Sequence, residues 1–182
     1  MRVDRLEVQL ARDQEDDGLD GGQSREAART ALGCLEMAVD GFEDAVGLTG
    51  PITAIEVPAG ERLSFLIRRF DKHHATVELF LRSFAVELCP DFKGAQWRFF
   101  ETSTGTVFMV PSGYDSLHVC IDESRFDARV SAEVAGLILS LYMLARLCDV
   151  SRSQEHMRML VRLRNYALTN AQATTIFRIL LR

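Results

Sequence analysis

Apolar residues recur at helical spacing in one part of the chain and alternate with polar residues in another. Residues 74–89 place a single apolar face on a helix, made of Val77, Phe80, Leu81, Phe84 and Leu88. Pro90 follows directly and predicts the end of that helix. A shorter helix is predicted over residues 60–70, and residues 52–57 are rich in β-formers, which predicts extended structure.

Strands are predicted in the middle of the chain. The stretch "AQWRFFETSTGTVFMVPSG", residues 95–113, alternates, passes through a turn at 102–105 and becomes apolar again, which is typical of a β-hairpin. Residues 116–122 predict a third strand, and residues 126–130 predict a short fourth one. The third strand has one face of Leu117, Val119 and Ile121 and another of His118 and Cys120.

Helices return after the strands. Ser131 is suited to cap the strongly apolar helix predicted over residues 132–148, and two further helices are predicted at 152–168 and 171–181. Strands that follow one another without crossover helices argue against a parallel, doubly wound sheet. The predicted fold class is therefore α+β: an antiparallel four-stranded meander packed against several helices, with an extra N-terminal helix.

The first 50 residues differ from the rest in charge. They contain 12 acidic and 5 basic residues, a net charge of −7, whereas the remaining 132 contain 14 acidic and 16 basic residues, a net charge of +2. Residues 13–23 are acidic and glycine-rich, which predicts a solvated linker, and an apolar helical pattern runs from Ser24 to Gly41. We predict an acidic, flexible N-terminal extension with one helix over residues 1–50 and an α+β domain over residues 51–182.

Composition sets the class of protein. With 182 residues, 47% of them hydrophobic, the chain is long enough to bury a core without disulfides or a metal. The four cysteines show no C-x-x-C spacing, and the charged N-terminus has no signal-peptide core. The longest apolar run, residues 134–147, is interrupted by Ser140 and Arg146 and is too short to span a bilayer. We expect a reduced, cytoplasmic protein without membrane contact.

Residue patterns that carry catalytic chemistry are sparse. His73 and His74 are adjacent, so on a helix they point about 100° apart and do not form a metal-ligand pair. Cys120 and His118 share a strand face, the minimum for a cysteine nucleophile, but no third orienting group stands out. No G-x-S-x-G elbow or glycine-rich phosphate loop occurs. We predict no enzyme activity, catalytic residue, metal or cofactor; a cysteine-dependent hydrolase using Cys120 and His118 remains an alternative.

Nucleic-acid binding is the second alternative. Residues 129–182 hold eight arginines against three acidic residues, and Arg158 and Arg162 lie four apart, near Arg164. The chain as a whole carries a net charge of −5, which disfavours direct nucleic-acid binding. The slightly basic body also disfavours imitation of DNA by acidic side chains. A DNA-binding accessory protein that uses these three arginines remains open.

Five stretches follow one another along residues 52–180: "VPAGERLSFLIRRF", "QWRFFET", "TVFMVP", "VCIDESRF" and "VSAEVAGLILSLYMLARL". Their order and spacing resemble those of the plasmid-borne antirestriction proteins typified by ArdB and KlcA. The matching positions are Trp97, Phe99, Glu101, Met109, Pro111, Asp122, Phe126, Ser131, Ala132, Ala135 and Gly136. The chain departs from the family at Phe100 and Phe108, where tyrosine is usual, and at Glu123 and Ser124, which replace a Gly-Asn pair.

The resemblance implies inhibition of type I restriction in the host cell, without catalysis, without a cofactor and not by DNA mimicry. The implied partner is a host protein complex, either the type I restriction-modification machinery or its regulator. Exposed aromatic side chains beside a shaped turn suit such binding. The predicted partner-binding residues are Trp97, Arg98, Asp122, Ser124 and Phe126. A packing role for Trp97 and a turn-forming role for Asp122 stay open, and the oligomeric state is not predicted.

Overall fold

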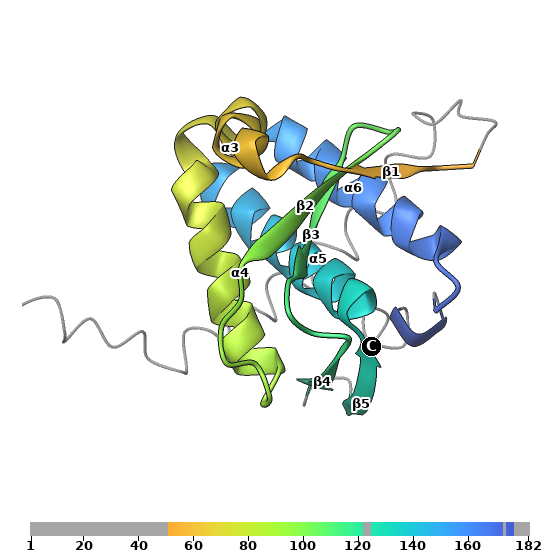
Figure 1. Ribbon diagram of the computed structural model, residues 1–182. Coiled ribbons are helices and arrows are strands. Elements are labelled where there is room, and N and C mark those ends of the chain that lie inside the picture. The colour runs from red at the N-terminus through yellow and green to blue at the C-terminus, as the bar shows by residue number, and fades with distance from the viewer. Residues whose placement is uncertain (1–50, 122–124, 173, 177–182) are drawn as a thin grey trace, which may run out of the picture.

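Helices surround a small sheet in the computed structural model, which describes residues 51–121, 125–172 and 174–176 (Figure 1). In chain order the elements are β1 (Ala54–Glu56), α3 (Arg62–Phe70), α4 (His74–Leu88), β2 (Trp97–Thr102), β3 (Val107–Pro111), β4 (Ser116–Ile121), β5 (Phe126–Ser131), α5 (Ala132–Ser151) and α6 (Gln154–Thr169). The predicted α+β class is confirmed. The predicted extension over residues 1–50, with its helix, and most of the predicted helix 171–181 lie outside the described residues.

The strands form two separate sheets. β1, β2 and β3 pair in that order, and β4 and β5 form a two-stranded hairpin. The predicted single four-stranded meander is therefore wrong, because β3 does not pair with β4 and the extended segment at 52–57 joins the first sheet as β1, with Ile55 opposite Glu101. The hairpin predicted over residues 95–113 is confirmed as β2 and β3, with Phe99 opposite Met109.

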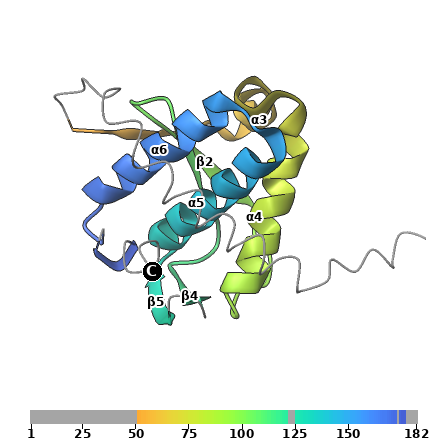
Figure 2. The ribbon, with the colours of Figure 1, turned by 180° about the vertical axis from the view of Figure 1, so that it is seen from behind.

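Helix α5 packs against the edge of β3 where a fourth strand would have to pair. The Met109 N–H donates to Ser140 Oγ across 2.9 Å, so this backbone group bonds to the helix and not to another strand. The approach is close because Gly136 has no side chain. A Cβ at that position would lie 2.3 Å from Met109 O and 2.9 Å from Val110 Cα. Seen from behind, α5 and α6 cover the first sheet (Figure 2).

Helix α5 is the centre of the core. Ser131 caps its N-terminus as predicted, since the Ser131 Oγ accepts from the Val134 N–H at 3.2 Å. The helix continues to Ser151, beyond the predicted end at Cys148, and every residue from 134 to 145 is buried. Within the described part of the chain, α5 is the one helix long and apolar enough to cross a membrane, but 78% of that window is buried inside the protein. Its apolar surface belongs to the core.

Helices α3 and α4 stand beside the first sheet (Figure 1). The buried face predicted for α4 is confirmed: Val77, Leu81, Phe84 and Leu88 are buried and Phe80 is partly buried. Two apolar residues of α4 lie outside that face, since Leu79 is 54% and Val86 63% exposed. The helix therefore has a core side and a second apolar side that faces solvent.

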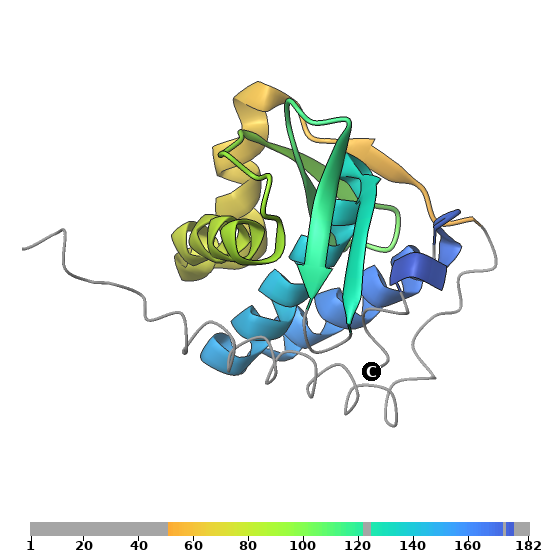
Figure 3. The same ribbon diagram turned by 90° about the horizontal axis from the view of Figure 1, so that it is seen from below.

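The β4–β5 hairpin projects beside the helices (Figure 3). The alternation predicted for its first strand is confirmed, because Leu117, Val119 and Ile121 are at most 1% exposed. His118 and Cys120 occupy the other face and are partly exposed. One face of the hairpin thus seals the core, and the opposite face presents polar side chains to solvent.

Candidate functional site

A groove of about 860 Å³ opens between α3, α4 and the chain that leads into β2. Its buried lining includes Leu66, Trp97 and Phe99. Its exposed lining includes Leu63 and Leu79, with 64% and 54% of their surface in contact with solvent. Solvent-exposed leucines in a groove are typical of a binding site, because a bound molecule would remove their apolar surface from water.

Aromatic stacking holds the β2 side of the groove. The Phe92 ring stacks on Trp97, with centroids 5.9 Å apart, and on Tyr114, with centroids 5.8 Å apart. The Tyr114 hydroxyl accepts from the Lys93 N–H at 2.9 Å and donates to Gly94 O at 3.2 Å. Gly94 has a φ of 98°, which a residue with a side chain rarely adopts. The loop between α4 and β2 is therefore fixed in place, and with it this wall of the groove.

Charged side chains surround the apolar lining. Arg62, Arg82 and Glu78 line the groove together with His74. Arg62 also contributes to the lowered pKa of Glu56, although the hydrogen bond from Arg98 is the larger cause. Two arginines against one glutamate favour a bound segment that carries a carboxylate beside its apolar side chain.

The two exposed leucines of this groove were not among the residues predicted from the sequence. The spacing of apolar residues outside the core faces was the signal that could have revealed them. Leu63 and Ile67 lie four apart on α3, and Ile67 is 46% exposed. Leu79 and Val86 lie seven apart on α4. Such spacings put each pair on one side of its helix, away from the buried residues.

Two of the predicted partner-binding residues, Trp97 and Arg98, point to opposite sides of β2, because successive strand residues alternate. Trp97 is 9% exposed and lines the groove. Arg98 is on the outer side, where its Nε and Nη2 donate to the Glu56 carboxylate at 3.0 and 2.6 Å. Its guanidinium also lies 5.1 Å from the Phe100 ring centroid. Their roles in partner binding stay predictions.

The predicted turn site is only partly described. Asp122 and Ser124 lie outside the described residues. Phe126, at the start of β5, is 4% exposed and belongs to the core cluster. Its side chain therefore holds the hairpin against the body, and its proposed contact with a partner stays a prediction.

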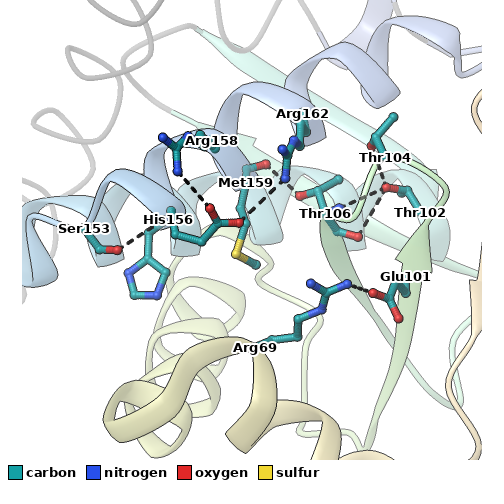
Figure 4. Close-up of polar contacts among 11 residues, drawn as sticks. Arg69, Glu101, Thr102, Thr104, Thr106, Ser153, His156, Arg158, Met159 and Arg162 are labelled. Atoms are coloured by element: carbon teal, nitrogen blue, oxygen red, sulfur yellow. Dashed lines mark hydrogen bonds and ion pairs between the residues drawn. The ribbon is translucent and has the colours of Figure 1, made fainter. Parts of the chain in front are cut away.

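Two of the three arginines of the DNA-binding alternative, Arg158 and Arg162, have an acidic neighbour on α6 (Figure 4). Arg158 Nη1 lies 3.3 Å and Arg162 Nη1 3.7 Å from the Glu155 carboxylate. Arg69, whose pKa is lowered mainly by burial and then by neighbouring positive charge, pairs with Glu101 close by. Arg164 is partly buried on the same helix. Glu155 therefore offsets part of the positive charge that binding to a phosphate backbone would require.

The Cys120 and His118 pair acquires a third group in the structure. Asp127 is directly opposite Cys120 across the hairpin, and its Oδ1 lies 2.5 Å from His118 Nε2. Cys120 Sγ lies 3.6 Å from the same nitrogen. A catalytic triad needs the thiol on one imidazole nitrogen and the carboxylate on the other, so this arrangement is not a triad. The register of the two strands, which places Asp127 opposite Cys120, was the signal that could have predicted this third group.

Comparison with known proteins decides the family. A model of antirestriction proteins matches residues 90–180, half of the chain. The chain belongs to the antirestriction protein family. The resemblance inferred from the sequence is confirmed. The matched residues contain the β2 side of the groove, the β4–β5 hairpin and helices α5 and α6, whereas α3 and α4 precede them.

Individual antirestriction relatives cover more of the chain. YubI of Escherichia coli strain K12 is 33% identical over 96 residues, which are 53% of this chain and 67% of YubI. The antirestriction protein KlcA of Escherichia coli is 28% identical over 137 residues, 70% of this chain and 94% of KlcA. A solved structure matches with a TM-score of 0.64 and 25% identity, over 72% of this chain and 96% of that one. It comes from work describing KlcA and ArdB as having a novel fold and antirestriction activity against type I DNA restriction systems in vivo but not in vitro.

Proposed function

We propose that this protein relieves type I restriction of incoming DNA by binding a host protein in the cytoplasm, without catalysing a reaction. Membership of the antirestriction family supports the activity. The match to the KlcA and ArdB structures supports type I systems as the target, because activity against those systems in vivo is described for these proteins. Activity in vivo but not in vitro also favours a partner that is present in the cell.

The groove between α3, α4 and β2 carries the proposed binding site. Leu63 and Leu79 remain largely exposed in a groove whose lining includes Trp97. Binding energy at protein interfaces concentrates where aromatic and apolar groups are enclosed by a partner. The partner segment proposed for this groove presents an apolar side chain to the leucines and a carboxylate to Arg62 and Arg82.

Two observations support a mechanism without catalysis and without DNA mimicry. Cys120 and Asp127 reach the same nitrogen of His118, which does not build a nucleophile and its base. Residues 51–182 carry 16 basic and 14 acidic side chains, so they do not imitate the dense negative charge of DNA. Both observations support inhibition through protein binding.

A phage-plating experiment tests this proposal. Unmodified phage is plated on a type I restricting host that expresses the wild type, Leu79→Glu or Val86→Glu. Leu79 and Val86 are similarly exposed on α4, but only Leu79 lines the groove. We expect the wild type and Val86→Glu to restore plating. Leu79→Glu is expected to lower the plating efficiency at least about tenfold, because removing a charge from water against the apolar side chain of a partner costs more than about 1.4 kcal/mol of binding.

Further variants distinguish the groove from the turn at residues 122–126 and from the arginines of α6. Equal protection by folded Leu79→Glu and Val86→Glu would exclude the groove as the binding site. Asp122→Ala then tests the turn predicted from the sequence, and paired Arg158→Ala and Arg162→Ala substitutions test the DNA-binding alternative. We expect the double arginine variant to keep its protection. If the wild type itself, expressed and folded, gave no protection against any type I system tested, the proposed function would fail.

A further inference from the structure

The solvent-facing side of the β4–β5 hairpin gathers three metal-ligating side chains. His118 and Cys120 are two residues apart on β4, and Asp127 is the cross-strand partner of Cys120 on β5. One ligand atom from each residue, imidazole nitrogen, thiol sulfur or carboxylate oxygen, lies within 4.8 Å of the others. His118 and Cys120 are partly exposed and Asp127 is exposed, so the cluster is open to solvent and to ions.

The distances approach those of a tetrahedral zinc site. Zinc bonds to sulfur, nitrogen and oxygen put a thiolate and an imidazole nitrogen about 3.5 Å apart and a nitrogen and a carboxylate oxygen about 3.4 Å apart. Cys120 Sγ and His118 Nε2 already lie 3.6 Å apart. His118 Nε2 and Asp127 Oδ1 are 2.5 Å apart and must separate by roughly 1 Å to admit the ion. The Asp127 side chain is 74% exposed and has room to rotate.

Neighbouring residues hold the cluster in place, and one of them forms an ion pair with the nearby Arg129. The opposite face of β4 is locked in the core by Leu117 and Val119. The His118 N–H donates to the Asp91 carboxylate at 3.1 and 3.3 Å, which fixes the backbone that carries the imidazole. Arg129, the cross-strand neighbour of His118, pairs with the same carboxylate at 2.9 Å. Supporting contacts of this kind set the affinity of a metal site.

We propose that His118 Nε2, Cys120 Sγ and the Asp127 carboxylate bind one zinc ion, a property separate from the proposed antirestriction mechanism. A nitrogen, a sulfur and an oxygen ligand suit Zn²⁺ in preference to Mg²⁺ or Ca²⁺, which favour oxygen alone. Binding replaces the contact between His118 and Asp127 with bonds to the metal. The proton held between Nε2 and the carboxylate passes to solvent, the neutral imidazole keeps its proton on Nδ1, and the thiol proton of Cys120 also passes to solvent. Three protein ligands leave the fourth position to water.

Cobalt reports on such a site because a thiolate bound to Co²⁺ absorbs in the near ultraviolet. Titration of the full chain with Co²⁺ is expected to give this charge-transfer band with one equivalent, and Zn²⁺ is expected to abolish it by competition. Cys120→Ser removes the band, while His118→Gln and Asp127→Asn weaken binding by about tenfold or more. The matched controls Cys148→Ser, His74→Gln and Asp115→Asn change residues outside the cluster and keep the wild-type titration.

Thiol protection tests the site in the wild type, independently of any folding defect in a variant. The chain is alkylated with and without one equivalent of Zn²⁺, and each cysteine is quantified by mass spectrometry. Zinc is expected to slow the labelling of Cys120 by at least about tenfold, with Cys89 and Cys148, both buried, as internal references. The proposal is overturned if Cys120 labels at the same rate with and without zinc, or if Cys120→Ser keeps the cobalt band.

Discussion

Helices α5 and α4 are both rich in apolar residues, but they use them differently. α5 is in contact with β3, α4, α6 and both strands of the second hairpin, and its apolar side chains are enclosed on every side up to its last turn, where Val150 is 50% exposed. α4 packs mainly against α5, more lightly against α3 and β4, and leaves Leu79 and Val86 in solvent. Apolar content therefore does not by itself separate a core from a binding surface. How completely the neighbouring elements enclose a helix decides which of the two it provides.

Two leucines of α4 test this difference most directly. Leu81 is fully buried and Leu79 is 54% exposed. We expect Leu81→Ala to lower the free energy of unfolding by about 2–5 kcal/mol, because it removes core contacts and leaves a cavity. Leu79→Ala is expected to change it by less than about 0.5 kcal/mol. Urea denaturation of both variants gives the comparison, and similar losses for the two would mean that the groove side of α4 is also part of the core.

Two glycines sharpen the comparison at the α5 contact. A Cβ at Gly136 would lie 2.3 Å from a backbone oxygen of β3, whereas nothing lies within 4 Å of a Cβ at Gly60. Gly136→Ala should lower the free energy of unfolding by about 1–3 kcal/mol, although alanine ordinarily favours a helix over glycine by up to about 1 kcal/mol. Gly60→Ala is the matched control, with an expected change below about 0.5 kcal/mol. A stabilised Gly136→Ala would contradict the close approach of α5 to β3.

The free energy of unfolding should also depend on pH, through a buried histidine. His156 is 6% exposed at the start of α6, and its Nδ1 lies 2.7 Å from Ser151 Oγ at the end of α5. Burial, and then the nearby His73, lower the pKa of His156 from its ordinary 6.5, while Glu155 opposes this. Below pH 6.5, His156 takes up a proton more readily in the unfolded chain than in the folded chain. The stability that neutral His156 contributes is therefore present above pH 6.5 and is lost as the pH falls below it.

The measurement is the free energy of unfolding at about pH 7.5 and about pH 5.5, in the wild type and in His156→Gln. The carboxylates with lowered pKa values, Glu56 and Asp91, start from 4.5 and 3.8 and titrate below this interval. We expect the wild type to lose stability across the interval and the variant to lose clearly less. An equal loss in both would assign the pH dependence to other groups.

The sequence predicted features that depend on local patterns. The buried faces of α4 and β4 followed from spacing, and the cap at Ser131 followed from the side chain that precedes the apolar helix. The β2–β3 hairpin followed from alternation and a turn. The family followed from the order of short motifs around Trp97 and Gly136. Each of these signals lies within a few residues of the feature that it predicts.

The features that were missed depend on contacts between distant residues. The break between the two sheets arises from α5 at the edge of β3, a contact between Met109 and Ser140 that no local pattern reveals. The groove needs α3, α4 and the β2 side to meet, and each supplies only part of the lining. The third member of the His118 and Cys120 cluster, Asp127, comes from the register of β5.

The covered edge of β3 also protects the protein against aggregation. An open strand edge offers unpaired N–H and C=O groups to other chains, and proteins avoid long exposed edges for that reason. At the β3 edge of the first sheet, the Met109 N–H donates a hydrogen bond to Ser140 Oγ. At the other end β1 has only three residues and includes the charged Glu56. Among the described residues, this sheet has no long edge at which copies of the protein could join strand to strand.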